Sequence, residues 1–171
     1  MTLRRQAPAR QAAASRGSPN VRRSPTGVTV LLDVNVLVAL AWPNHVHHAT
    51  ALAWFDEVGR AGFATCSVTQ SGFARVSSNQ RAIPDARSPR EAREILRRIT
   101  ALPGHVFWPD DIEIASNEHI AWERLGSHAQ VTDAHLLALA IRRGGRLATF
   151  DRGILDLAPE GKAEYVVMLG G

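Results

Sequence analysis

Three aspartates in this chain stand where a strand ends or a helix begins. Asp33 follows the apolar run VTVLL, Asp151 follows LATF, and Asp133 comes just after Thr132 in VTDAHLLALA. Ligands collect beyond the carboxyl ends of strands in open parallel sheets. Two carboxylates at ~4 Å repel by about 4 kcal/mol unless they bind protons or a cation. Such oxygen ligands select Mg²⁺ or Mn²⁺, which can activate water for hydrolysis of a phosphate ester.

Each aspartate also has an explanation that requires no chemistry. Asp33 can be an ordinary loop residue. Asp133 can be an acid favoured in the first turn of a helix, where the dipole contributes only ~0.3–1 kcal/mol. Asp151 can be a turn former in TFDRG. The three residues therefore indicate a site as a set, and not singly.

The segments that must position these residues alternate between strands and helices. The expected strands are 28–33, 62–66, 105–108, 146–150 and 165–169. The expected helices are 34–41, 46–60, one that starts near Ser67 or Thr69, 90–101, one capped by Asp110 or Asp111 that runs to about Leu125, and one capped by Thr132 that ends at the glycines 144–145. This alternation predicts an α/β fold, an α/β/α sandwich with a central, mostly parallel sheet.

Length and composition are those of one folded domain. The chain has 171 residues, of which 45% are hydrophobic and 21% are charged. No apolar run is long enough to span a membrane. The single cysteine, Cys66, excludes an internal disulfide and fits a reducing compartment. We therefore expect a cytoplasmic protein.

Positive charge is concentrated at the start of the sequence. Residues 1–27 contain six arginines and no acid, and are rich in Ala, Ser and Pro, which predicts a disordered extension. Removing those six from the 20 basic residues leaves 14 against 16 acidic ones, a formal charge of −2 for residues 28–171. The predicted folded domain, 28–171, therefore lacks a generally basic surface, and its contact with nucleic acid must be local.

The order of segments resembles the PIN-domain ribonucleases of VapC type, the toxins of bacterial toxin–antitoxin pairs. The likeness rests on LLDVNVLVAL, HVHHATALAWF, SVTQSGFARVSSN, VTDAHLLALAIRRGG and LATFDRGI, and spans about residues 28–157. It implies a small α/β/α domain and a Mg²⁺-dependent endoribonuclease that cuts RNA with a metal-activated water. It further implies inhibition by a VapB-like antitoxin and, by analogy, a homodimer.

The resemblance assigns roles to individual positions. Asp33 and Asp133 match metal ligands of the family, and Asp151 matches the last acid of its site. Asn35 matches a polar position that steadies Asp33, and Thr149 matches a hydroxyl residue that contacts metal-bound water or phosphate. These three aspartates are therefore the predicted catalytic and metal-binding residues.

One position departs from the family pattern. Many members carry a Glu in the helix that here reads SVTQSGFARVSS, and either Gln70 or Gly72 stands in its place. Gln70 can still bond a metal-bound water, but it brings no charge, so we expect weaker metal affinity. Two arginines, Arg75 and Arg152, are candidates for holding a substrate phosphate; each can equally be a surface charge.

Other activities remain open at this level. A haloacid-type phosphatase would carry a second Asp at position 35, and a flap-type nuclease needs more acids and a longer chain. A catalytically weak or inactive PIN-like module that binds RNA is the main alternative, and the missing Glu favours it. Unpaired RNA, in single strands or loops, is the expected substrate. His135 is expected to be a packing or surface residue, and His47 and His48 to lie on a helix surface.

Overall fold

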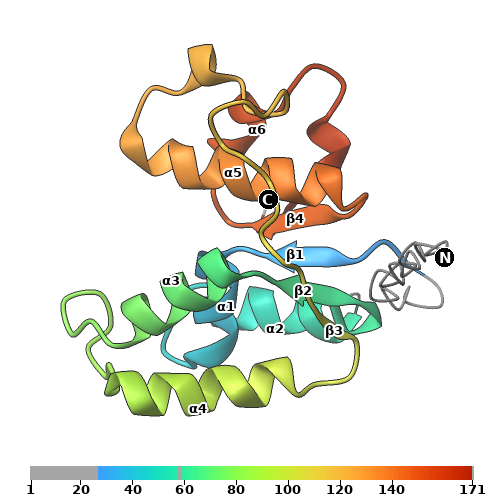
Figure 1. Cartoon of the computed structure of the whole chain (residues 1–171). Helices are drawn as coiled ribbons and strands as arrows, with labels where there is room; N and C mark the ends of the chain where they lie inside the picture. The colour runs from blue at the N-terminus through green and yellow to red at the C-terminus, as the bar shows by residue number, and fades with distance from the viewer. Residues whose placement is uncertain (1–26, 58, 171) are drawn as a thin grey trace, which may run out of the picture.

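A parallel sheet forms the centre of the molecule (Figure 1). The computed structural model describes residues 27–57 and 59–170. Within them the five strands have the order β3-β2-β1-β4-β5, and all neighbours are parallel. The strands are β1 (Val30–Leu32), β2 (Phe63–Thr65), β3 (His105–Phe107), β4 (Arg146–Thr149) and β5 (Val166–Met168). Because β1 lies between β2 and β4, the residue after β1 is at the middle of the carboxyl edge.

Helices cover both faces of this sheet (Figure 1). They are α1 (Val34–Ala41), α2 (His48–Glu57), α3 (Ser67–Ser77), α4 (Pro89–Thr100), α5 (His128–Arg142) and α6 (Ile154–Leu157), with short 3₁₀ turns η1 (Gly59–Ala61), η2 (Trp122–Arg124) and η3 (Ala163–Tyr165). In the figure, α5 and α6 lie on one side of the sheet and α1 to α4 on the other. The predicted α/β/α sandwich with a parallel sheet is therefore confirmed.

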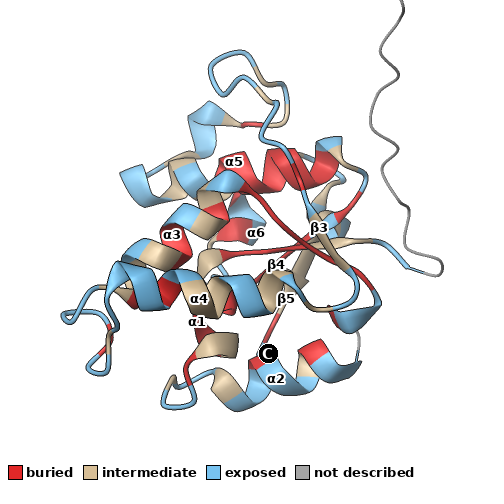
Figure 2. Cartoon of the chain, turned by 60° about the horizontal axis from the view of Figure 1, so that its bottom comes forward, coloured by how far each residue is buried: buried red, intermediate tan, exposed pale blue. Residues whose placement is uncertain are grey.

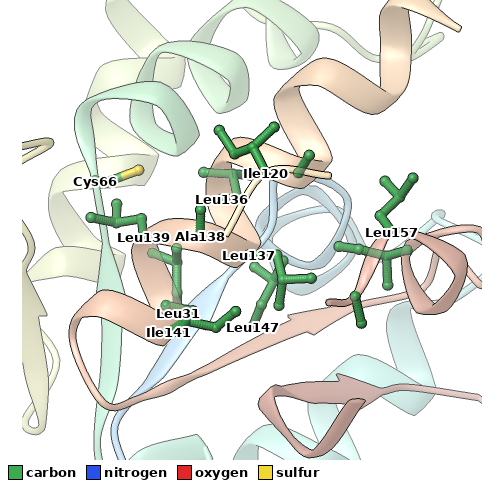
Figure 3. Close-up of a cluster of buried hydrophobic side chains, with 14 of the residues drawn as sticks. Leu31, Cys66, Ile120, Leu136, Leu137, Ala138, Leu139, Ile141, Leu147 and Leu157 are labelled. Carbon is green, nitrogen blue, oxygen red and sulfur yellow. The ribbon is translucent and has the colours of Figure 1, made fainter. Parts of the chain in front are cut away.

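Consecutive side chains of β1 pack on opposite faces of the sheet. Leu31 joins the apolar cluster beneath α5, and Figure 3 shows it within this group of side chains. Leu32 joins the second cluster, with α1 and Phe63. The red segments of Figure 2 show that the buried residues follow the sheet and the inner faces of the helices. The strand is buried on both faces, which explains its continuous apolar sequence.

The helix expected from Asp110 or Asp111 to Leu125 is wrong. This segment consists of turns and ends in η2. The two aspartates do not cap a helix, because their side chains bind α5 instead. Asp110 Oδ2 lies 3.0 Å from His135 Nε2, and Asp111 pairs with Arg142 at 3.2 Å and with Arg143 at 3.1 Å.

The expected cap at Thr132 is also wrong, because α5 begins four residues earlier, at His128. Gln130 Oε1 accepts hydrogen bonds from the backbone N–H groups of Gly126 at 2.7 Å and Ser127 at 3.1 Å. A glutamine in the first turn thus satisfies N–H groups just before the helix. Asp133 consequently lies in the second turn, so a helix-start role does not explain it.

The expected disordered extension, residues 1–27, lies outside the described residues except for Gly27. Among the helices that the structure describes, none is long and apolar enough to cross a membrane.

Candidate active site

Asp33 is a buried carboxylate at the end of the central strand. It is only 6% exposed. Its Oδ1 accepts a hydrogen bond from the Val34 N–H at 2.6 Å, at the start of α1, and its Oδ2 accepts one from the Thr149 hydroxyl at 2.7 Å. The apolar sequence on either side of Asp33 is therefore a strand and a helix that meet at this residue.

Thr149 connects Asp33 to the rest of the edge. Asn35 Nδ2 donates to Thr149 Oγ1 at 3.0 Å, and the backbone N–H of Asp151 donates to the same oxygen at 3.1 Å. Asn35 Oδ1 in turn accepts from the Phe150 N–H at 3.3 Å. Asn35 thus steadies Asp33 through Thr149, whose own hydroxyl proton is engaged by the carboxylate.

The carboxylates influence one another electrostatically. Burial, together with the negative charges of Asp33 and Asp151, raises the pKa of Asp133 to about 6. Burial also raises the pKa of Asp33, and the charge of Asp151 adds to this, although the bonds from Thr149 and Val34 oppose it. The three aspartates predicted from the sequence therefore act on one another at a single edge of the sheet.

The Asp151 side chain is hydrogen-bonded to the backbone of its own loop. Its Oδ1 accepts a hydrogen bond from the Gly153 N–H at 2.8 Å, and the residue is exposed. Within residues 27–57 and 59–170, no three His, Cys, Asp or Glu side chains are grouped closely enough to hold a metal ion. The arrangement is thus an open group of carboxylates and not a closed cage.

The donor set nevertheless fits a hard divalent cation. Every candidate ligand is a carboxylate oxygen, and two of the carboxylates have raised pKa values because of burial and mutual repulsion. A divalent cation bound at this edge would offset the unfavourable negative charge. Mg²⁺ retains several waters and is usually bound by only one or two carboxylates, so a closed cage is not required.

Gln70, and not Gly72, occupies a position that can carry a functional side chain. Gly72 is buried, and a Cβ built on it would lie 2.5 Å from Val34 Cγ2, so α1 and α3 leave no room there. Gln70 is half-buried and its Nε2 donates to Thr65 Oγ1 at 2.9 Å. Thr65 Oγ1 also lies 2.8 Å from His105 Nε2.

Sequence reasoning did not identify Thr65 as a residue of this edge, nor its contact with the ring of His105, the first residue of β3. Thr65 is the last residue of β2, and this position at the carboxyl end of a strand was the available signal. His135 is buried against the segment that follows β3, as a packing residue. Both candidate phosphate ligands, Arg75 in the last turn of α3 and Arg152 beside Asp151, are exposed.

The PIN domain family matches residues 30–159 of the sequence. This chain belongs to the PIN-domain family. Ribonuclease VapC39 of Mycobacterium tuberculosis is 46% identical to this PIN-domain chain over 139 residues, which cover 81% of this chain and 100% of VapC39. The resemblance to VapC-type PIN domains is therefore confirmed.

Solved structures agree on the fold of this PIN domain. One is Mycobacterium tuberculosis VapC20, a toxin that cleaves the sarcin-ricin loop, with a TM-score of 0.54, 16% identity and coverage of 76% of this chain and 99% of that one. Another is VapBC2 from Rickettsia felis, bound to a DNA fragment from its promoter, with a TM-score of 0.53, 11% identity and coverage of 82% and 96%.

Proposed function

We propose that this PIN domain is a metal-dependent endoribonuclease and the toxin of a VapBC-type toxin–antitoxin pair. The observation that carries the proposal is the group of acidic side chains at the carboxyl edge of the sheet, where burial, and then the negative charges of Asp33 and Asp151, raise the pKa of Asp133 to about 6. Such repulsion is unfavourable in a protein that binds nothing there. The similarity to ribonucleases, 46% identity to VapC39, supports RNA as the substrate.

Each residue of the edge has a distinct role in the proposed reaction. Asp33 and Asp133 would hold Mg²⁺ or Mn²⁺, and Asp151 would complete the acidic pocket. When bound, the ion would neutralise charge on the phosphodiester and lower the pKa of the attacking water. Thr149 fixes the orientation of Asp33 through the 2.7 Å bond, so this carboxylate needs little reorganisation to bind a cation.

Substrate and partners follow from charge and from the relatives. The formal charge of −2 for residues 28–171 disfavours a broad contact with duplex phosphates, so unpaired RNA in single strands or loops is the proposed substrate. Arg75 and Arg152 are the proposed phosphate contacts. A VapB-like antitoxin is the proposed inhibitor, because the neighbour from Rickettsia felis is a VapBC complex. A homodimer and a cytoplasmic location complete the proposal.

Cleavage of labelled RNA by the purified chain tests the activity. We expect cleavage with Mg²⁺ or Mn²⁺, none with EDTA, and a loss of at least ~100-fold in rate for Asp33→Asn. Asp56→Asn is the matched control, because Asp56 makes an exposed ion pair with Arg60 at 2.8 Å. Cleavage that persists in EDTA, or an Asp33→Asn variant as active as Asp56→Asn, would overturn the proposal.

A catalytically weak RNA-binding module is the second candidate, because Gln70 brings no charge to the edge. The same experiment separates the two functions. Retention of RNA by the wild-type chain without cleavage, at any metal concentration, would support the binding module. Size-exclusion chromatography of the purified chain tests the proposed dimer, and co-purification with a VapB-type protein tests the proposed inhibitor.

A further inference from the structure

An aromatic pair lies beside the candidate active site. The ring of His47 is stacked on the ring of Phe150, with 4.4 Å between centroids and 13° between planes. His47 belongs to the loop between α1 and α2, and Phe150 directly follows β4. The sequence predicted only a helix-surface histidine at this position, so the pairing is a property of the tertiary structure.

Phe150 lies between two residues of the candidate active site in the sequence. Its neighbours in sequence are Thr149, which binds Asp33, and Asp151. Its backbone N–H donates to Asn35 Oδ1 at 3.3 Å. A ligand seated on this aromatic pair would therefore lie beside the backbone segment that carries Thr149 and Asp151.

The loop that carries His47 is held by hydrogen bonds. The His47 N–H donates to His45 Nδ1 at 3.2 Å, and the His47 carbonyl accepts from the Ala51 N–H at 2.9 Å. His48 Nδ1 donates to the Ala39 carbonyl at 2.7 Å, which fixes the loop to α1. These bonds thus hold the backbone at His47, and the His47 ring is oriented by its stacking on Phe150.

Protection of the Phe150 ring from solvent does not by itself explain why residue 47 is a histidine. Phe150 is half-buried and packs against the second apolar cluster, whereas His47 is exposed. An apolar residue would shield the phenyl ring better. The adjacent Val46 is apolar but is 85% exposed to solvent. A polar aromatic ring that stacks on Phe150 and stays open to solvent has the character of a binding platform.

We propose that His47 and Phe150 form a platform on which an unpaired RNA base, next to the scissile phosphate, stacks. Unpaired bases stack on Phe, Tyr, Trp and His side chains, with little dependence on sequence. One stacked base contributes about 5- to 150-fold in affinity. This inference rests on the proposed function and gives it a source of affinity, because the acidic edge repels the phosphate backbone.

Binding of a single-stranded RNA oligonucleotide in EDTA tests the platform without cleavage. The probe carries fluorescein at one end and 2-aminopurine at an internal position. We expect wild type to bind it and to quench 2-aminopurine by stacking. His47→Ala should weaken binding by at least about fivefold and relieve the quenching, whereas His47→Tyr should retain both. The matched control is His128→Ala, at the exposed first residue of α5, which should bind as wild type does.

Three results would overturn the platform: no binding by wild type, equal binding by wild type and His47→Ala, or a tyrosine variant as weak as the alanine variant. A parallel cleavage assay in Mg²⁺ separates this inference from the proposed function. Metal-dependent cleavage with a KM unaffected by His47→Ala would reject the platform and keep the nuclease. Loss of RNA binding in His47→Ala, with no cleavage by wild type, would support the platform and reject the nuclease.

Discussion

Thr149 donates its hydroxyl proton to Asp33 Oδ2 over 2.7 Å, and this bond joins the ends of two neighbouring strands that are 116 residues apart in the sequence. Thr149 Oγ1 also accepts hydrogen bonds from the side-chain Nδ2 of Asn35 and from the backbone N–H of Asp151. One fully buried hydroxyl therefore fixes the carboxylate and the loop that follows β4. Its loss should affect both stability and activity.

Thr149→Val should lower the free energy of unfolding by about 1–3 kcal/mol, because it leaves buried partners without a hydrogen bond. It should also reduce RNA cleavage, since Asp33 loses its orientation. Urea unfolding in EDTA measures the first effect and the cleavage rate measures the second. Thr149→Ser keeps the hydroxyl and should retain most of both. If the valine variant matches the serine variant in both measurements, the hydroxyl has no such role.

Asp133→Asn should stabilise the metal-free protein near neutral pH. The folded-state pKa of Asp133, about 6, lies above its ordinary value of 3.8, so the folded chain holds this proton more tightly than the unfolded chain does. Stability contributed by the protonated group is complete below pH 3.8 and is lost as pH rises through 6. We expect Asn to raise the Tm by about 2–6 °C at neutral pH, after allowance for solvent screening.

Thermal unfolding in EDTA at several pH values checks this expectation for Asp133. The advantage of the Asn variant should shrink as the pH falls below 6 and vanish below 3.8. Asp156→Asn, at an exposed position of α6, provides the control substitution. An advantage that is absent at neutral pH, or that grows in acid, would show that the Asp133 carboxylate is not repelled in the folded state.

Gln70→Glu should increase the affinity for Mn²⁺ by about tenfold, because it adds a negative charge at the position where many family members carry Glu. Ser71→Glu adds the same charge to the exposed neighbouring position of α3 and is the matched control. Isothermal titration calorimetry compares the two variants with wild type. Equal affinities of both variants would show that Gln70 does not face the metal site.

Gly72→Ala should destabilise the protein by about 1–2 kcal/mol, although alanine is the better helix former. The added Cβ would lie 2.5 Å from Val34 Cγ2, between α1 and α3. Because Val34 follows Asp33, relief of this contact would also displace the carboxylate. Removal of the obstructing methyl groups in the Gly72→Ala, Val34→Ala double variant should recover activity. If the single variant is as stable and active as wild type, this close contact is unimportant.

The sequence by itself determined most elements of the fold. Strands buried on both faces are continuous apolar runs, and the helices between them carry apolar residues at helical spacing. The alternation of strands and helices could therefore be predicted from the sequence. The family could be recognised as well, because its motif residues lie near the ends of strands and the beginnings of helices. The stretch from Asp110 to Leu125 was one exception, since its aspartates bind His135, Arg142 and Arg143, in or directly after a distant helix, and not the local backbone.

Only the tertiary structure decided how the site residues act on one another. Thr149 and Asp33 belong to neighbouring strands, and their bond depends on the strand order, which no local pattern encodes. The exclusion of Gly72 as the position of the family Glu depends on the approach of α3 to α1. The stacking of His47 on Phe150 depends on how the loop between α1 and α2 packs against the residue that follows β4. Sequence patterns report burial and local hydrogen bonding, whereas contacts between distant segments are set by the packing of the whole chain.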